Sequence, residues 1–325
     1  MIEKINIKKI SKLFPIIGII ILIYIIIDIG TEKIVYTFIS IPIQLYALAL
    51  LLFIPRLFLS SYKWQYICRK QKMDFSLLYL AKIFLITLFL GSVTPGSIGL
   101  HLRIYYLKEK SKASLEKCIA NSLTESALAL IAGLFLALIG SIVLIDKFPE
   151  LIVILLPFFI LYTSAFVVLI EKGRGNRIFN IIIRPLIPAK FKETVNKSIE
   201  SLYKDIPRLK DTLFPFLIEI LIWVVAASQV YIIAQAFSIE IPYFLFVLIS
   251  IISVIISNVL PISIGGLGIR EGTFVFLMSK FGVDPEIAFV ISLSGFMVKI
   301  LIPGLIGLII SVGMGKRVIK PTNSL

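Results

Sequence analysis

Two short stretches of the chain interrupt long apolar runs with the same residue types. Residues 94–99 read Thr-Pro-Gly-Ser-Ile-Gly and precede Arg103; residues 260–268 read Leu-Pro-Ile-Ser-Ile-Gly-Gly-Leu-Gly and precede Arg270 and Glu271. Proline and glycine break helices, so each stretch exposes backbone polar groups in an apolar setting. Lipid tolerates such a break only where it is buried in protein or lines a wet cavity. A matched pair of breaks indicates a transport-type site between two structural repeats.

The second break carries the stronger chemical signal. Its glycines let the backbone approach another group closely, and a helix is predicted to begin at about Ile269. The N–H groups at that helix end and the planar donors of Arg270 together suit an anion such as phosphate. Glu271 lies in the predicted first turn, where it favours the helix dipole or neutralises Arg270. The alternative interpretation is a tightly packed loop with an internal Arg270–Glu271 pair.

Two further cations lie at informative places. Arg103 follows the first break as Arg270 follows the second, with snorkelling to the interface as its alternative role. Lys299 is near the middle of the apolar run 287–313, where a charge marks a functional site by default. The alternative for Lys299 is a structural ion pair with Glu125, Glu219 or Glu271. The full set predicted to contact a head group is Arg103, Glu125, Ser263, Gly265, Gly266, Gly268, Arg270, Glu271 and Lys299.

Composition defines the class of protein. Of 325 residues, 58% are hydrophobic, and the mean hydropathy is +1.01, which indicates an all-α polytopic membrane protein. The net charge of +14 comes from Lys and Arg between apolar runs, so it indicates cytoplasmic loops and anionic lipid rather than nucleic acid. Two isolated cysteines and a single histidine predict no metal site, no disulfide framework and no cofactor. Without a recognisable catalytic motif, we expect no enzyme activity.

Helix length and loop charge together predict the topology. Apolar runs long enough to span, or nearly so, fall at 13–29, 38–59, 75–93, 118–145, 151–170, 214–237, 243–260 and 287–313. Basic gaps at 60–74 and 108–117 both belong in the cytoplasm, although one full-length run separates them. Residues 75–107 are therefore predicted to enter the membrane, break, and return to the same side.

The second half predicts the mirror arrangement. The basic segment 171–213, read as a cytoplasmic interfacial segment, and the basic tail place 243–281 as a hairpin entering from outside. The expectation is one integral membrane domain over 1–325, with about six full transmembrane helices and two re-entrant hairpins. Residues 75–145 and 243–313 would form inverted repeats, with both termini cytoplasmic, in the cell membrane. A plain bundle of eight to ten crossings is the alternative.

The break sequences resemble a known family. Residues 260–272 closely resemble the "LPISIGGLGVREG" signature of proteins that share the transmembrane region of lysylphosphatidylglycerol synthase. Residues 95–105 resemble its "PGxxGExxRxY" element, with Leu100 where an acidic residue is frequent, and Lys63-Trp64 resembles its "RW" pair. Glu125 lies where an "ER" pair is usual, with Ser126 in place of the arginine. The resemblance implies a membrane role in lipid translocation; aminoacyl transfer by the soluble domain of the synthases is not expected of this chain.

The favoured function is therefore that of a lipid translocase. A phosphate-bearing head group of an anionic or lipid-linked species would lie between the breaks, with its acyl chains in lipid. One alternative is a membrane enzyme or enzyme subunit acting on lipid-linked sugars, with Glu125 or Glu271 as the base. Another is a non-transporting partner of a lipid synthase. Assembly into a homo-oligomer is compatible with each.

Overall fold

The protein is a bundle of helices. The computed structural model describes residues 20–94, 97–111, 113–170, 207–260 and 263–318, and within these ranges every regular element is a helix. After a helical segment at Ile20–Ile29, the α-helices are α2 (Thr31–Ile39), α3 (Ile43–Leu51), α4 (Phe53–Lys70), α5 (Leu77–Ser92), α6 (Arg103–Ser111), α7 (Leu115–Val143), α8 (Glu150–Ile170), α11 (Leu213–Ala234), α12 (Tyr243–Val259), α13 (Ile269–Ser279), α14 (Pro285–Phe296) and α15 (Ile302–Val318). Short 3-10 turns lie at Ile98–Leu102, Leu209–Asp211 and Gln235–Phe237, and Met297–Leu301 is a π-helix that joins α14 to α15.

Five continuous helical stretches in the described part are long and apolar enough to cross a membrane. They are Ile43–Lys70, Leu115–Val143, Glu150–Val168, Leu209–Phe237 and Pro285–Gly313. These stretches overlap five of the six runs predicted as full crossings, and the all-α polytopic class is confirmed. The sixth run, 13–29, lies partly outside the described residues, as does most of the predicted interfacial segment 171–213.

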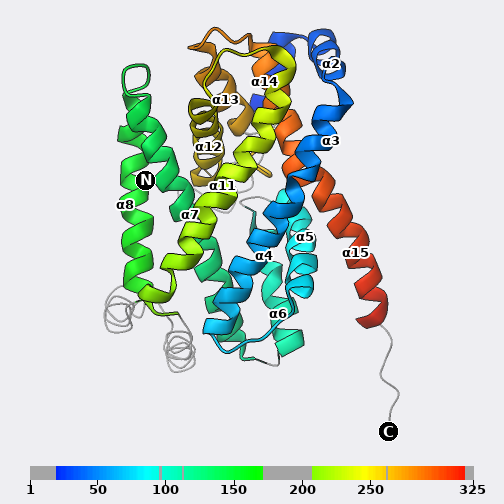
Figure 1. Cartoon of the computed structure of the whole chain (residues 1–325), viewed down its shortest axis with the longest axis vertical. Coiled ribbons are helices and arrows are strands. Elements are labelled where there is room, and N and C mark those ends of the chain that lie inside the picture. The colour runs from blue at the N-terminus through cyan, green and yellow to red at the C-terminus, as the bar shows by residue number, and fades with distance from the viewer. Residues whose placement is uncertain (1–19, 95–96, 112, 171–206, 261–262, 319–325) are drawn as a thin grey trace, which may run out of the picture.

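The chain reverses direction inside the molecule at both breaks. In Figure 1, α5 rises from the lower end to mid-height, and α6 returns to the lower end. Helix α12 descends from the upper end to mid-height, and α13 returns to the upper end. The helices that lead into these reversals, α5 at Leu77–Ser92 and α12 at Tyr243–Val259, are too short for a full crossing. The two hairpins therefore point at one another from opposite ends of the bundle.

Each hairpin packs against the long helix of the other half. The two most extensive helix contacts join α5 to α15 and α7 to α12. Glycine makes both contacts close: a Cβ on Gly307 of α15 would lie 2.1 Å from the Leu85 carbonyl oxygen of α5. On α7, a Cβ on Gly140 would lie 2.9 Å from Cδ1 of Ile252 in α12. Small residues thus let neighbouring membrane helices approach one another closely. The superposition of 75–145 on 243–313 stays a prediction.

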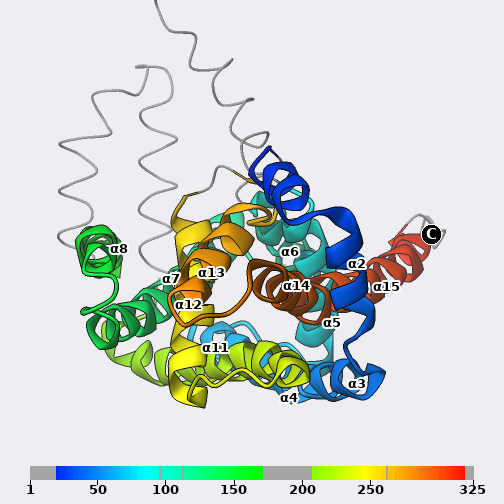
Figure 2. The same ribbon diagram turned by 90° about the horizontal axis from the view of Figure 1, so that it is seen from above.

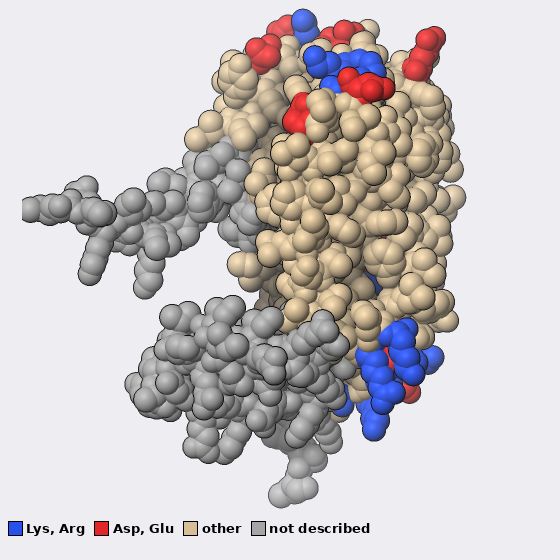
Figure 3. Space-filling model, turned by 90° about the vertical axis from the view of Figure 1, so that its left-hand side faces the viewer, with Lys and Arg blue, Asp and Glu red and all other residues tan. Residues whose placement is uncertain are grey.

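A wide apolar surface surrounds the bundle between two charged ends. Figure 3 shows Lys, Arg, Asp and Glu gathered at the top and bottom of the face in view, with a broad uncharged band between them. Large apolar side chains on this surface, which we call the exposed apolar belt, are well exposed, including Val153 on α8 at 75% and Ile309 on α15 at 73%. These two helices lie at opposite sides of the bundle in Figure 2, with α12, α13 and α14 between them. Exposed apolar area of this extent fits contact with lipid.

Candidate functional site

The Thr94 hydroxyl stabilises the backbone on both sides of the first break. The Thr94 hydroxyl donates to the Leu90 carbonyl at 2.8 Å and accepts from the backbone N–H of Gly99 at 2.8 Å. The hydroxyl thereby serves one carbonyl at the end of α5 and one N–H of the turn that follows. Ser97 adopts a left-handed φ of 55°, and Gly99 sits so close that a Cβ there would lie 2.1 Å from the Leu90 oxygen.

The second break begins a helix with its own acidic cap. The backbone N–H of Gly268 donates to Oε2 of Glu271 at 2.7 Å, which is one half of a capping box at the start of α13. Oε1 of the same carboxylate accepts from Nε of Arg270 at 2.9 Å and from its Nη2. The Arg270 guanidinium also lies over the Phe296 ring, 4.5 Å from its centroid.

The two breaks touch one another near the middle of the molecule. Gly265 has a φ of +60°, and a Cβ there would lie 2.7 Å from the Ser92 carbonyl oxygen at the end of α5. A side chain at this position would therefore be strained and would collide with the other half. Glycine is required here because the two hairpin tips meet backbone to backbone.

Four charged side chains form the first charge cluster: Lys63, Arg103, Glu125 and Glu219. Lys63 Nζ donates to Oε1 of Glu125 at 2.7 Å and to Oε2 of Glu219. Arg103 Nη1 donates to the second oxygen of Glu125. All four are buried, and their formal charges sum to zero. This cluster joins α4, α6, α7 and α11 through paired charges, the arrangement that buried charges require.

Aromatic and amide groups support the first charge cluster from α4 and α7. The Arg103 guanidinium lies over the Trp64 ring at 5.3 Å, and Trp64 Nε1 donates to Oδ1 of Asn121 at 2.7 Å. Asn121 Nδ2 in turn donates to Oε1 of Gln71 at 2.6 Å. Because its charged and amide groups are hydrogen-bonded to one another, we interpret the first charge cluster as a structural network.

A second charge cluster consists of Arg56, Arg270, Glu271 and Lys299. Its single carboxylate is engaged by Arg270 and the cap of α13, as described above. The Lys299 ammonium has no ion pair and no hydrogen bond among the described residues, although only 8% of this residue is exposed. None of its expected partners, Glu125, Glu219 or Glu271, pairs with it. The cluster therefore carries an excess of positive charge.

The backbone of α14 and α15 explains how Lys299 and Arg56 come together. Lys299 lies in the π-helical segment, and Pro303 lacks the N–H that would bond the Lys299 carbonyl in α-helical geometry. Arg56 Nη1 donates to that carbonyl at 3.1 Å. Arg56 Nε, by contrast, is buried and has no partner in the described part of the chain.

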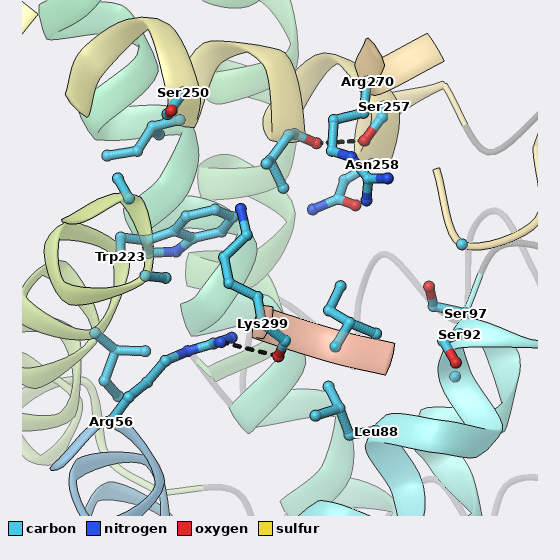
Figure 4. Close-up of a pocket in the computed structure, with 18 of the residues that line it drawn as sticks. Arg56, Leu88, Ser92, Ser97, Trp223, Ser250, Ser257, Asn258, Arg270 and Lys299 are labelled. Atoms are coloured by element: carbon cyan, nitrogen blue, oxygen red, sulfur yellow. Dashed lines mark hydrogen bonds between the residues drawn. The ribbon is translucent and has the colours of Figure 1, made fainter. Parts of the chain in front are cut away.

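A cavity of about 240 Å³ lies between the breaks and the second charge cluster. Ser97 of the first break and Gly265 of the second both line it, as do the three cations Arg56, Arg270 and Lys299. Figure 4 shows Lys299 reaching toward Trp223, with Arg56 on one side and Arg270 beside Asn258 on the other. The remaining lining includes Leu88, Gly91, Ser92, Leu100, Glu219, Trp223, Ser250, Ile251, Val254, Ser257, Asn258 and Ile300.

The structure separates the predicted site residues into three groups. Gly265, Arg270 and Lys299 line the cavity. Arg103 and Glu125 belong to the first charge cluster and are absent from the cavity wall. The others flank the wall within the second break: Ser263, Gly266, Gly268 and Glu271. Gly266 packs against the wall, since a Cβ there would lie 2.9 Å from the Ser257 hydroxyl oxygen.

Sequence reasoning missed most of the cavity wall, including Arg56, Ser250 and Asn258. Arg56 sits inside the apolar run 38–59, and the rule that singled out Lys299 could have found it. Ser250 and Asn258 lie in α12, where serine and asparagine have no signal that separates lining from packing. In the described residues no group of His, Cys, Asp and Glu side chains is arranged to hold a metal ion.

Comparison with known proteins gives a family and one distant relative. The family described as the lysylphosphatidylglycerol synthase TM region matches residues 14–307, nearly the whole chain. A UPF0104 membrane protein of Methanothermobacter thermautotrophicus is 24% identical over 254 residues. That match covers 71% of this chain and 73% of the relative. Residues 14–307, which the family matches, include both breaks and both charge clusters.

Proposed function

The chain belongs to the family that shares the transmembrane region of lysylphosphatidylglycerol synthase, and from that premise we propose that it translocates an anionic membrane lipid. The head group would occupy the cavity between the two breaks. One observation carries the proposal: Lys299, buried and without a partner among the described residues, lines a cavity together with Arg56 and Arg270. Unpaired positive charge in a low-dielectric setting calls for an anion.

The arrangement of the hairpins supports translocation rather than binding alone. The hairpin tips meet at mid-height, and the cavity lies beside that contact, between the two ends of the bundle. A head group held there has travelled about half of its path. Because each hairpin packs on the long helix of the other half, movement of one half against the other would open the cavity toward either end. The acyl chains would stay in lipid along the exposed apolar belt.

The charge at the two ends supports a cytoplasmic lower end. The described helix ends and loops there are mainly basic, with Arg69, Lys70, Lys72, Lys108, Lys110, Lys117, Arg208 and Lys210 against Asp74, Glu109, Glu116 and Asp211. The described helix ends and loops at the upper end are mainly acidic, with Asp28, Glu32, Asp146, Glu150, Glu240, Asp284 and Glu286 against Lys33, Lys147 and Lys280. The positive-inside rule then places the first hairpin as entering from the cytoplasm of a cell membrane.

A hydrolytic or transferase role has less support. Glu125 and Glu271 would have to serve as the base, yet each accepts hydrogen bonds from an arginine or lysine. The oxygens of both carboxylates are thus occupied by partners within the protein. We therefore propose a binding and translocating role without covalent chemistry.

Lipid binding by charge-deleted variants tests the proposed function. The purified protein in nanodiscs should bind the anionic lipid phosphatidic acid, and Lys299→Gln should weaken that binding about ten-fold or more, the value of a lost charge-assisted contact. Arg270 is tested as the double variant Arg270→Gln/Glu271→Gln, so that no unpaired carboxylate is left buried. Lys82→Gln is the matched control, because Lys82 is an exposed cation on α5.

Translocation is measured on the same proteins in liposomes. A fluorescent phosphatidic acid in the inner leaflet becomes accessible to a membrane-impermeant quencher only after it crosses the bilayer. The expected order is fast crossing with the unaltered protein and Lys82→Gln, and slow crossing with Lys299→Gln. Unchanged binding and crossing by well-folded Lys299→Gln and double variants would refute the proposed function.

A further inference from the structure

The buried charges of the described residues do not balance. Buried charged side chains are Lys63, Arg103, Glu125, Glu219, Arg270, Glu271 and Lys299, and half-buried Arg56 joins them at the cavity wall. The first charge cluster is neutral, with two cations and two carboxylates. The second has three cations and one carboxylate, which leaves two positive charges over. That surplus lies entirely on residues that line the cavity.

We infer that the head group bound in the cavity carries two negative charges on a terminal phosphate, as in a phosphomonoester or a diphosphate, rather than the single charge of a phosphodiester. This inference rests on the proposed function, which requires an anionic head group but leaves its charge open. A buried site is most stable when its charges are compensated, and two surplus cations are compensated by a dianion. A phosphodiester would leave one positive charge buried without a counter-ion.

The free donors of the cavity match the oxygens of a terminal phosphate. A phosphomonoester presents three terminal oxygens, whereas a phosphodiester presents two non-bridging ones. Three cationic side chains line the cavity, and the Lys299 ammonium and Arg56 Nε have no hydrogen-bond partner in the described residues. The Ser250 hydroxyl on the opposite wall is likewise buried and unpartnered. Each oxygen of a terminal phosphate thus has a donor available.

The one carboxylate in the cavity wall does not cancel this surplus. Glu219 lines the cavity, but its Oε2 accepts from Lys63, which lies in the first charge cluster. Its charge is therefore already used to balance that cluster. At about 240 Å³, the cavity is several times the roughly 30 Å³ that one water occupies, so a phosphate and its first ester linkage can enter.

Two lipids that differ by one methyl group test the inference. Phosphatidic acid ends in a phosphomonoester, and phosphatidylmethanol is its methyl ester, with a single charge and almost the same size. Each is added to phosphatidylcholine nanodiscs that hold the protein, and affinity is measured at pH 8, where a phosphomonoester carries about two charges. The expected result is at least about ten-fold tighter binding of phosphatidic acid.

Removing one surplus cation should shrink the preference. Lys299→Gln lowers the net charge of the second charge cluster from +2 to +1. The affinity for phosphatidic acid should therefore fall close to that for phosphatidylmethanol, whose own affinity should change less. Lys299→Arg keeps the charge and should keep the preference, as should Lys82→Gln. Equal affinity of the unaltered protein for the two lipids would overturn the inference and leave the proposed function standing. Binding of neither lipid above the phosphatidylcholine background would overturn the proposed function itself.

A soluble competitor separates a lipid ligand from free phosphate. Glycerol 3-phosphate has the same terminal phosphate without acyl chains, and it should compete with phosphatidic acid only weakly. Competition at equal affinity would show that the site takes a water-soluble phosphomonoester, which would overturn the lipid assignment.

Discussion

The two charge clusters contain the same residue types but differ in net charge and in how completely their charges are paired. Each includes an arginine that begins the return helix of a hairpin, Arg103 in α6 and Arg270 in α13. Around Arg103, Glu125 on α7 and Glu219 on α11 bring the cluster to neutrality. Around Arg270, the long helix contributes Lys299, and a single neighbouring carboxylate is left to oppose three cations.

We infer from this difference that the two charge clusters have different roles. A neutral, fully paired cluster stabilises the packing of the helices that contribute to it and leaves no charge for a ligand. A cluster with surplus charge and unpaired donors beside a cavity is suited to bind an anion. We therefore propose that the sequence similarity of the two breaks does not extend to the charge clusters beside them: the first cluster is structural and the second binds the ligand.

The largest expected effect comes from breaking the neutral cluster. Glu125→Gln leaves Lys63 and Arg103 buried with one carboxylate between them, so the free energy of unfolding should fall by about 3–5 kcal/mol. We expect this loss in detergent unfolding titrations followed by circular dichroism.

The matched comparison uses the surplus cluster. Lys299→Gln removes a charge that has no partner among the described residues, so it should leave the free energy of unfolding unchanged or raise it. Glu116→Gln, at a partly exposed position in the first turn of α7, should also change little. If Glu125→Gln proved as stable as the unaltered protein, the structural assignment of the first charge cluster would fail.

The contact between the hairpin tips gives the next effect. Gly265→Ala places a side chain at a φ of +60° and 2.7 Å from the Ser92 oxygen, so strain of about 1–2 kcal/mol is joined by a collision. Lipid affinity should fall as well, because the cavity wall must shift.

Gly282→Ala isolates the strain from the collision. Gly282 has a φ of +73°, but nothing lies within 4 Å of a Cβ built there. Its substitution should lower the free energy of unfolding and leave lipid affinity intact. Equal effects of the two substitutions on both quantities would show that the hairpin tips do not depend on their close contact.

The smallest effect concerns the way each break is held. Only the first uses a threonine hydroxyl, so Thr94→Ala should lower the free energy of unfolding by about 1 kcal/mol, the worth of its hydrogen bonds. Thr94→Ser retains the hydroxyl and should behave like the unaltered protein. A fall in phosphatidic acid affinity that exceeds the fall in the free energy of unfolding would contradict this assignment and make Thr94 a binding residue.

The sequence alone predicted the class of protein, five helical stretches long and apolar enough to cross a membrane, and the two positions where the chain turns back. These features are local: apolar run length, proline and glycine, and the sign of charge in the gaps act over a few turns of helix. The same local evidence picked out Arg270, Glu271 and Lys299, because a charge inside an apolar run is visible without knowledge of its surroundings.

Tertiary structure decided which of these charges are free. Lys63 finds its carboxylates 62 and 156 residues away in the chain, and Arg56 meets the Lys299 backbone 243 residues away. Such pairings depend on how far each helix is rotated and how closely glycine lets it approach its neighbour. A different rotation of one helix would change which of its charges are paired, yet leave the apolar pattern of the sequence unchanged. For that reason the sequence could place both arginines after breaks, whereas only the packed structure shows that Arg103 is neutralised and Lys299 is not.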